Sequence, residues 1–495
     1  MQPGPPHSFW LGHIPTMAKV APRFPASIHP HVMMADLERK HNFGPLWFLD
    51  TWPISKDPQM IISDPTIARQ VAQSRPLGKH PIVDQYVGHI TGPTSILTSN
   101  GEEWRKVRAL FNPAFALSHL MTLSGTIVDH TLTFCASLEE HAARGDIFLL
   151  EDLTTRLTID VIGCVVLDAD LQAQRAENPL VTAFRRSIYW TPKASEVNPL
   201  VNLNPMRPLV TWWYGRQMDR LLGQMLDERA AKRASGATVG RKTAIDLALD
   251  AQQGSAVDPA IRQQAIDQFK TFVFAGHDTT SSTISYVFYL LSLHPDCLAR
   301  TRAEHDQVFG SDLVQSAERI RATPHLLNQL PYTLAVIKET LRMFPVADGI
   351  RGGEKGYDVT LDGKRYSTAG FMIMINHYAL MHREDLFPQP FEFHPDRFLA
   401  PRPATSPQIF DIPKDAWRPF EKGPRACIGQ ELALLEMKII MVLTLRRFDV
   451  TAAYDDWDRQ HGGPGPVVDG FRSYQILVSS AKPCEEMPAR VRKRH

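Results

Sequence analysis

Apolar residues recur at intervals of three to four positions along much of this chain, which is the pattern of amphipathic helices. The stretches with this period are 31–41, 64–73, 100–108, 117–144, 150–167, 210–232, 258–293, 330–344 and the run after residue 429. Shorter apolar or alternating runs, typical of strands, are 46–50, 60–63, 357–361, 364–367, 371–375, 448–450 and 474–478. The pair at 357–361 and 364–367 flanks Asp362-Gly363, which predicts a two-residue hairpin.

Three segments break this pattern and are predicted to be loops. Residues 75–94 are interrupted by glycine and proline, 191–208 contain four prolines, and 234–257 are polar. The first 27 residues form a proline-rich lead-in, and the basic end at 490–494 is predicted to be a solvated tail. The sequence contains no internal repeat and no low-complexity tract.

Composition narrows the class of protein. The 495 residues are 43% apolar and 22% charged, which is ordinary for a globular protein with a large core. Lys and Arg number 54 against 53 Asp and Glu, so the net charge is +1 and nothing indicates a nucleic-acid partner. No run of 18 apolar residues occurs, so no membrane-spanning helix is predicted. The five cysteines are scattered without a Cys-x-x-Cys pair, which favours a reducing compartment over a disulfide framework or a zinc site.

The strongest candidate for chemistry is Cys427, in the loop from Phe420 to Gly429 that precedes a long apolar helix. A thiolate at a helix N-terminus is stabilised by the helix dipole, which lowers its pKa and suits it to be a metal ligand or a nucleophile. Gly423 and Gly429 allow a flat group to approach the backbone, and Arg425 adds a positive charge two residues before the sulfur. Taken alone, Cys427 could equally be a buried free cysteine.

The long helix predicted over 258–293 has a locally unfavourable centre. Residues 275–280 read Ala-Gly-His-Asp-Thr-Thr, which places a glycine, an acid and two β-branched hydroxyl residues in mid-helix. A threonine can bond to the carbonyl one turn earlier and bend the helix, which would open space beside a cofactor. The alternative is an ordinary kinked helix, and His277 is expected to be a packing or surface residue rather than a metal ligand.

Two pairs of residues at helical spacing add candidates. Trp104 and Arg108 are four apart, and Glu339 and Arg342 are three apart, so each pair shares one helix face. Arg397 follows in the segment 393–398, Phe-His-Pro-Asp-Arg-Phe. On spacing alone these could be ordinary core or surface residues, because most Glu–Arg pairs of this kind are solvated salt bridges.

Together these segments resemble the cytochrome P450 family. The Cys427 loop matches its pattern Phe-x-x-Gly-x-Arg-x-Cys-x-Gly, and 275–280 match its Ala-Gly-x-Asp/Glu-Thr-Thr motif. The other segments match Trp-x-x-x-Arg and Glu-x-x-Arg and resemble Phe-x-Pro-x-Arg-Phe, in the family's order over residues 104–429. The resemblance implies one cytochrome P450 domain over 1–495, mainly α with a small β region. The haem would lie between the long central helix and the helix after Cys427.

The resemblance also implies roles for the matched residues. Cys427 would be the axial ligand of the iron of haem b, and Asp278 and Thr279 would handle protons where dioxygen reacts. A buried structural ionic cluster would be formed by Glu339, Arg342 and Arg397. The other residues expected around the haem are Trp104, Arg108, Ala275, Gly276, Arg351, Phe420, Gly423, Arg425 and Gly429. The residues expected to line a substrate pocket are Phe272, Val346, Ile350 and Phe471.

The implied activity is that of a haem-thiolate monooxygenase. One atom of O2 would enter a small hydrophobic organic substrate by hydroxylation, with epoxidation or desaturation as variants, and electrons would come from NADPH through a reductase. The overall pattern looks like fungal microsomal-type members that modify polyketides or terpenoids in secondary metabolism. The expected electron donor is NADPH–cytochrome P450 reductase, with cytochrome b5 as a second candidate donor. A haem-thiolate isomerase, dehydratase or peroxygenase and a non-catalytic haem-binding sensor remain alternatives.

Location and substrate are less constrained by the sequence. The proline-rich start resembles the hinge that follows the membrane anchor of microsomal members. The protein is therefore expected at the cytoplasmic face of the endoplasmic reticulum, in contact with the membrane surface, if an anchor was removed, and in the cytoplasm as a soluble protein otherwise. Asp348 is an acid in an otherwise apolar stretch, and it is expected either to bind a polar group of the substrate or to face solvent in a turn. Substrate identity and oligomeric state are left open.

Overall fold

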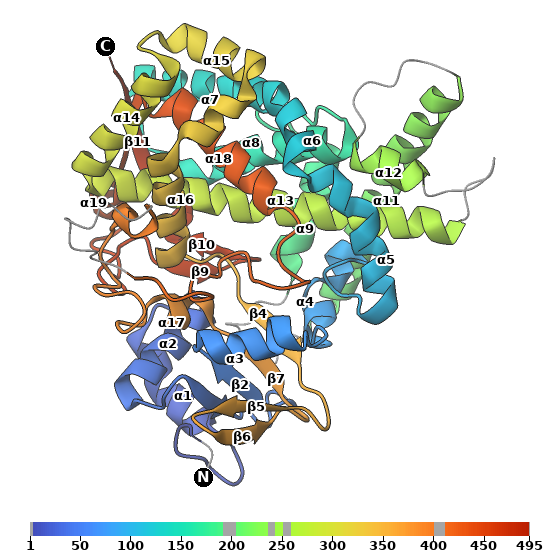
Figure 1. Ribbon diagram of the computed structural model, residues 1–495, viewed down its shortest axis with the longest axis vertical. Coiled ribbons are helices and arrows are strands. Elements are labelled where there is room, and N and C mark those ends of the chain that lie inside the picture. Colours follow the sequence, from blue (N-terminus) through green and yellow to red (C-terminus); the bar gives the residue numbers. More distant parts are fainter. Residues whose placement is uncertain (1–2, 192–203, 236–242, 251–258, 400–410, 495) are drawn as a thin grey trace.

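The computed structural model describes residues 3–191, 204–235, 243–250, 259–399 and 411–494 (Figure 1). The α-helices are α1 Ile14–Val20, α2 Pro30–His41, α3 Pro65–Arg69, α4 Ile82–Thr91, α5 Gly101–Phe111, α6 Leu117–Thr122, α7 Ser124–Arg144, α8 Leu150–Ile162, α9 Pro179–Trp190, α11 Met206–Ala234, α12 Ala244–Asp250, α13 Pro259–Leu293, α14 Pro295–Phe309, α15 Leu313–Ala322, α16 Pro331–Met343, α17 His377–Met381, α18 Gln430–Thr444 and α19 Tyr454–Gln460. Short 3₁₀ or π segments are η1 Ala21–Arg23, η2 Gln70–Ser74, η3 Asn112–Phe115, η4 Gly163–Leu167, η5 Pro324–Gln329, η6 Pro395–Phe398 and η7 Cys484–Glu486.

Within the described residues, the strands form four small sheets. They are β1 Leu46–Leu49, β2 Gln59–Ile62, β3 Phe148–Leu149, β4 Gly349–Gly352, β5 Asp358–Leu361, β6 Lys364–Ser367, β7 Met372–Ile375, β8 Phe448–Ala452, β9 Gln475–Leu477, β10 Ala481–Pro483 and β11 Pro488–Lys493. The largest sheet has the order β1-β2-β7-β4, in which only the β2–β7 pair is parallel. It joins the N-terminal segment to residues 349–375, and both lie at the end of the molecule marked N in Figure 1. The other sheets are β3-β11-β8, β9-β10 and β5-β6.

Helix α13 crosses the helical part of the molecule (Figure 1). It spans 35 residues, and most of them are buried. A helix that is apolar around most of its circumference is favourable only inside a core. It packs along α8, where the absence of a side chain at Gly276 allows close contact, because a Cβ there would lie 2.8 Å from Ile162 Cδ1.

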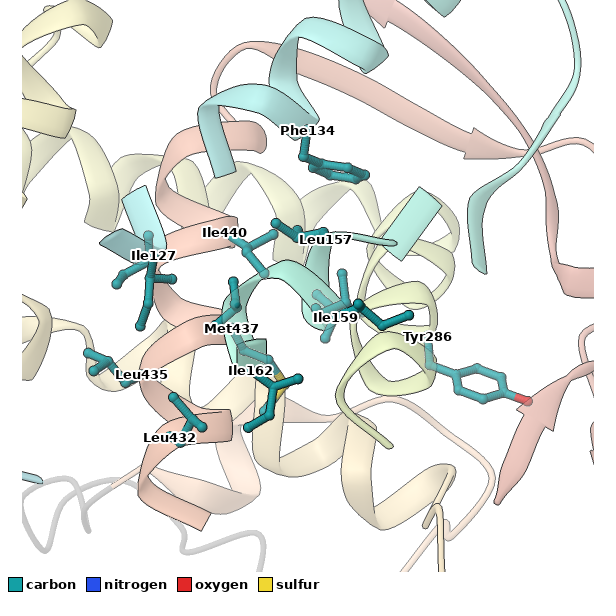
Figure 2. Close-up of a cluster of buried hydrophobic side chains, with 14 of the residues drawn as sticks. Ile127, Phe134, Leu157, Ile159, Ile162, Tyr286, Leu432, Leu435, Met437 and Ile440 are labelled. Atoms are coloured by element: carbon teal, nitrogen blue, oxygen red, sulfur yellow. The ribbon is translucent and has the colours of Figure 1, made fainter. Parts of the chain in front are cut away.

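Helix α18, which follows Cys427, is held by apolar packing. Figure 2 shows Leu432, Leu435 and Ile440 of α18 gathered with Ile127 of α7 and Ile162 of α8. All five side chains are almost fully buried. Burying side chains of this size contributes roughly 1.5–3 kcal/mol each. The loop that carries Cys427 is therefore attached to a helix that is largely buried in the core.

Most of the predicted helices and strands are confirmed, but three predictions about irregular segments are wrong. The predicted loop at 75–94 contains α4, whose Val87, Ile90 and Thr91 are buried on one face. The predicted linker at 234–257 contains α12, and the rest of it lies largely outside the described residues. The predicted basic tail is strand β11, which pairs with β3 and β8. Val491 of β11 is buried, and the basic residues on either side of it stay accessible. This alternation of buried and accessible side chains is typical of a strand with one face on the core.

The predicted break at 191–208 lies mostly outside the described residues, and α11 begins at Met206. The predictions from the sequence contain no counterpart of helices α9, α14, α15 and α19 or of strand β10. Within the described ranges, none of the helices has the length and apolar character needed to cross a bilayer.

Candidate active site

The Cys427 loop is a tight turn set against the N-terminus of α18. The backbone N–H of Cys427 donates to Phe420 O at 2.8 Å, and that of Ala426 donates to Gly423 O at 3.0 Å. Gly423 has a φ of +86°, and a Cβ on it would lie 2.2 Å from Ala72 O on the neighbouring segment. Only glycine fits this position without displacing the backbone.

The thiol of Cys427 lies among protein atoms and yet keeps accessible surface. Burial raises its pKa, while the backbone N–H groups of Gly429 and Gln430 and the guanidinium of Arg108 act in the opposite direction. The thiolate of a metal ligand is stabilised further by the metal itself. Arg108 also donates to the carbonyl of Ala426 at 2.8 Å, which holds α5 against the loop. The arrangement suits a thiolate ligand that faces open space within the molecule.

Three cationic side chains lie beside this loop, and they are the buried Arg351 and the half-buried Lys79 and Arg425. The guanidinium of Arg351 is about 1% exposed, and its Nε and Nη2 have no hydrogen-bond partner among the described residues. Arg425 bonds to Ser99 O and Asn100 Oδ1 at 2.8 Å and stacks on Trp104 at 4.5 Å. Burial, together with Arg351 and Arg425, lowers the pKa of Lys79 to about 7.

These cations have too little negative charge around them. Glu421 is the carboxylate that acts on both Arg351 and Lys79. Its Oε2 lies 3.6 Å from Arg351, while its Oε1 is bonded to Arg418. Burial and the repulsion from Arg351 lower the pKa of Arg425 to about 10. Cations gathered away from water around one carboxylate are costly, so the site fits a ligand that carries two carboxylates, as haem b does.

The centre of α13 has small or polar side chains with accessible surface, whereas most other side chains of the helix are buried. Ala275 is exposed and Thr279 is half-buried, although their neighbours along the helix are largely buried. Thr279 Oγ1 donates to Ala275 O at 3.0 Å, and Thr158 Oγ1 on α8 donates to His277 O at 2.9 Å. His277 itself is buried, with Nδ1 2.7 Å from Val273 O, so it packs within the fold.

Asp278 is buried and strongly bonded. Burial alone would raise its pKa, but Lys482, His277 and Ser479 outweigh burial and lower it to about 2. Lys482 Nζ lies 2.9 Å from Oδ1, and Ser479 Oγ donates to Oδ2 at 2.5 Å. Lys482 and Ser479 lie on and beside β10, and nothing in the sequence pattern linked them to Asp278.

The three residues expected to form an ionic cluster lie together in the core. Glu339 accepts from Arg342 at 2.7 and 2.9 Å and from Arg397 Nε at 3.1 Å. The backbone N–H of His394 donates to the same carboxylate at 3.0 Å, and Arg342 donates to Met381 O at 2.9 Å. Carbonyl and amide groups thus complete the hydrogen bonding of a buried ion pair, which such pairs require.

The four residues expected to line a pocket are placed differently from one another. Phe272 packs against Phe111 and Phe115 with ring centroids 5.1 and 5.0 Å apart, and it is nearly closed off from open space. Val346 is buried, and Ile350 keeps accessible surface on β4. Phe471 lies in an aromatic cluster with Phe344 at 5.2 Å. The segment near the C-terminus that reaches the middle of α13 is instead the turn between β9 and β10.

Asp348 neither faces solvent nor is free to bind a substrate. Its Oδ2 lies 3.0 Å from His31 Nδ1, and its Oδ1 accepts from the backbone N–H of His377 at 3.0 Å. Other residues of this region that the sequence did not point to are Lys79, Glu421, Ser479 and Lys482. Glu421 occupies a variable position of the Cys427 loop, and the other three are single polar residues outside the motifs, so no spacing could have identified them.

Known proteins resemble this chain over nearly its whole length. The family described as Cytochrome P450 matches residues 3–468. Cytochrome P450 monooxygenase acrF of Aspergillus aculeatus is 36% identical over 95% of this chain and 98% of its own length. Cytochrome P450 monooxygenase polC of Polytolypa hystricis is 34% identical over 99% of this chain and 89% of its own length. Among solved structures, the cytochrome P450DA heme domain matches 100% of this chain and 98% of its own chain, with a TM-score of 0.77. The two sequences are only 23% identical, so this likeness shows the fold alone.

Proposed function

The chain belongs to the cytochrome P450 family and is a haem-dependent monooxygenase, and we propose that Cys427 is the axial ligand of its haem iron. The observation that carries this proposal is the position of the thiol, which has accessible surface beside the backbone N–H groups of Gly429 and Gln430 at the start of α18. The haem, with electrons from NADPH through a reductase, supplies the activation of O2.

Around that ligand, the chain's own residues would bind and orient the haem. Arg351, Arg425 and Lys79 would bind its two carboxylates, since two nitrogens of Arg351 have no hydrogen bond and Glu421 is the carboxylate near both Arg351 and Lys79. Arg108 would hold the Cys427 loop through Ala426 O. Phe420 and Gly429 belong to the same turn, and Gly423 keeps the loop close to the Ala72 backbone.

On α13, Ala275 would leave room for the haem and for O2, because it is small and exposed while most residues around it on the helix are buried. Gly276 contributes chiefly by letting α13 approach α8. Thr279 would hold or pass a proton at its Oγ1, which already bonds to Ala275 O at 3.0 Å. Asp278 would be the acid that works with it. Glu339, Arg342 and Arg397 would keep α16 and the segment around η6 fixed behind the Cys427 loop.

The proposed substrate is a small hydrophobic organic molecule of fungal secondary metabolism, such as a polyketide or a terpenoid. The support is similarity to monooxygenases of fungi, including Cytochrome P450 monooxygenase ptmG of Penicillium ochrochloron, 29% identical over 99% of this chain and 90% of its own length. The reaction proposed is hydroxylation, with epoxidation or desaturation as variants. Ile350, with accessible surface on β4, is the pocket residue that the structure supports best.

The proposed electron donor is NADPH–cytochrome P450 reductase, with cytochrome b5 as a second candidate donor. Arg105 and Lys106 are exposed on α5, the helix that Arg108 attaches to the Cys427 loop. Lys106 pairs with Glu102 at 3.0 Å, so Arg105 is the cation of this helix proposed to meet an acidic flavoprotein. Turnover with a diflavin reductase tests this, and turnover with a ferredoxin system but never with that reductase would disprove it.

We place the protein at the cytoplasmic face of the endoplasmic reticulum, in contact with the membrane surface. Phe9 and Trp10 are 83% and 77% exposed, and the bond from His13 N to Asp50 O brings them near the loop of exposed Trp52 and Ile54. Exposed aromatic clusters of this kind mark membrane or protein contacts. Serine at positions 9 and 10 should lower liposome binding, whereas Tyr189→Ser, a change at an exposed aromatic elsewhere, should not.

The proposed role of Cys427 is tested by the optical spectrum of the reduced, carbon-monoxide-bound protein. A strongly red-shifted Soret band that Cys427→Ser abolishes is expected, and a spectrum typical of histidine-ligated haem would refute the assignment. Product formation coupled to consumption of O2 and NADPH then separates monooxygenation from isomerase, dehydratase or peroxygenase chemistry on the same fold. Haem binding without turnover on any substrate class would indicate a sensor.

A further inference from the structure

The carboxylate of Asp278 is held by residues that lie far away in the chain. Its Oδ1 is 2.9 Å from Lys482 Nζ, and its Oδ2 accepts a 2.5 Å hydrogen bond from Ser479 Oγ, a residue 201 positions later. Lys482 is on β10 and Ser479 is in the turn that precedes it. Figure 1 shows hairpin β9–β10 beside the middle of α13. Both oxygens of Asp278 are therefore engaged by one hairpin.

Lys482 also reaches a second acid on another helix. Its Nζ bonds to Glu151 Oε1 on α8 at 2.6 Å. The same oxygen of Glu151 accepts hydrogen bonds from Thr155 Oγ1 at 3.0 Å and Ser281 Oγ at 3.3 Å. One buried ammonium thus stands between two buried carboxylates, and removing it would leave both of them without a counter-charge.

The bonded state of Asp278 does not suit the donation of a proton. A group that gives or takes protons works best when its pKa lies near the working pH, whereas the pKa of Asp278 is about 2. Asp278 is also buried, while Ala275 and Thr279 supply the accessible surface at the middle of α13. Some change in its contacts must therefore precede any transfer of a proton through it.

We infer that Lys482 and Ser479 are positioning residues that hold the Asp278 carboxylate away from the accessible face of α13, so that movement of hairpin β9–β10 controls whether Asp278 takes part in the reaction. The inference rests on the proposed function, in which Asp278 and Thr279 manage protons. It adds two residues outside every motif of the sequence, and it assigns the control to one hairpin near the C-terminal end.

The hairpin is connected to the proposed wall of the substrate pocket. The backbone N–H of Ala481, the first residue of β10, donates to Val346 O at 3.0 Å. Gln475, the first residue of β9, donates through Nε2 to Pro345 O at 3.0 Å. Residues 345 and 346 lead directly into Ile350 and β4. A substrate that displaces this wall would therefore displace the hairpin and its contacts with Asp278.

Other charged or titratable groups surround this network. They are His277 on α13, Asp152 on α8, Arg185 on α9 and Glu486 in η7. Burial lowers the pKa of His277 and raises that of Glu486. Arg185 bonds to Asp152 at 2.9 Å. Lys482 is the cation that bonds directly to both Asp278 and Glu151, so substitution of Lys482 is the sharpest test.

The first experiment is infrared difference spectroscopy of the haem-loaded protein across a pH titration. Lys482→Met should produce a protonated carboxylic acid band near neutral pH that the wild type lacks, because two uncompensated buried carboxylates cannot both stay ionised. The band should be reduced or shifted in the double variant with Asp278→Asn. Lys482→Arg should suppress it, and Lys493→Met, at an exposed lysine outside the network, should not produce it. Absence of the band in Lys482→Met would overturn the inference.

The second experiment measures product formed per NADPH consumed as a function of pH. Lys482→Met should change this ratio by about tenfold or more and make it depend on pH, with little change in KM. Ser479→Ala, a smaller change that keeps the fold, should shift it in the same direction. If Asp278→Asn lowers the ratio while Lys482→Met and Ser479→Ala leave it as in the wild type, the inference fails and the proposed function stands. If the reduced, carbon-monoxide-bound wild type lacks the spectrum of a thiolate-ligated haem, the proposed function itself is refuted, and the inference is refuted with it.

Discussion

His31 and Asp348 are 317 positions apart in the chain, and His31 Nδ1 lies 3.0 Å from Asp348 Oδ2 in the interior. Gln475 determines how this contact must be protonated. Its Nε2 donates to Pro345 O, so its Oε1 accepts from His31 Nε2 at 3.0 Å. With the Nε2–H engaged, His31 can meet a carboxylate through Nδ1 only if that nitrogen also carries a proton. The pair is therefore a buried imidazolium and carboxylate that joins α2, the start of β9 and the segment before β4.

Asp348→Asn should destabilise the protein by about 3 kcal/mol at neutral pH, because it leaves the buried imidazolium without its counter-charge. His31 and its neighbours lower the pKa of Asp348 to about 2 although burial alone would raise it. A lowered pKa stabilises the fold above the pKa of the unfolded chain, near 3.9, and this contribution is lost as the pH falls toward about 2.

The check is denaturant unfolding of wild type and variant between pH 7 and pH 2. The difference in free energy of unfolding should be largest at neutral pH and should shrink below about pH 4. Asp362→Asn, at an exposed hairpin turn, is the matched control and should change little. Equal stability of Asp348→Asn and wild type at pH 7 would contradict the assigned ion pair. A tightly bound zinc ion held by His29, His31 and Asp348 would contradict it as well, because the metal would replace the proton.

Arg351→Met should have opposite effects on the haem-free and the haem-loaded protein. Without haem, two nitrogens of the buried guanidinium have no hydrogen bond and its contact with Glu421 is 3.6 Å long, so its removal should leave stability unchanged or raised. With haem, the variant should lose the cofactor faster, by about tenfold, since one charge-assisted contact is missing. Transfer of haem to apomyoglobin measures the loss. Arg365→Met, at an exposed arginine of β6, should match the wild type in both states.

Lys79 should make the haem-free protein more stable as the pH rises from about 7 to about 10. Burial and the repulsion from Arg351 and Arg425 lower the pKa of Lys79 to about 7 in the folded chain, against about 10.4 when unfolded. The unfolded chain therefore binds more protons in this window, and the free energy of unfolding rises with pH. Lys79→Met should flatten this part of the pH profile. An unchanged slope in the variant would mean that another group produces it.

Gly423→Ala should prevent normal haem incorporation. A Cβ there would lie 2.2 Å from Ala72 O, and φ is +86°. Gly363→Ala is the matched control, because Gly363 also has a positive φ of +74° but no atom within 4 Å of the added Cβ. The control should cost only about 1–2 kcal/mol of conformational strain. Haem content and thermal unfolding of the two variants separate strain from steric contact, and equal losses in both would show that the contact with Ala72 does not matter.

Local pattern was enough to predict the parts of this protein whose chemistry depends on neighbours in the chain. The Cys427 turn, the Thr279 bond to Ala275 and the pairing of Glu339 with Arg342 all join residues that are three to seven positions apart. Helices such as α13 and α18 follow from apolar periodicity, because burial of an apolar face is the main force that stabilises them. The family was likewise evident from motifs whose spacing is set by single turns and helices.

The predictions that failed concern segments whose structure depends on distant partners. The region 75–94 forms α4, and the basic end forms β11 only because β3 and β8 lie beside it. The sequence did not point to Ser479 and Lys482, which reach Asp278 from a distant hairpin, whereas the pocket role of Phe471, which packs against Phe344, stays a prediction.

Tertiary structure also decided the electrostatics of the site. Lys79, Arg351 and Arg425 come from three segments of the chain, and their mutual repulsion exists only after folding brings them together. The same holds for Lys482 between Asp278 and Glu151, and for His31 beside Asp348. Sequence spacing carries no information about such contacts, because the Coulomb energy and the desolvation of a side chain depend on its distance from other charges in space and on its burial.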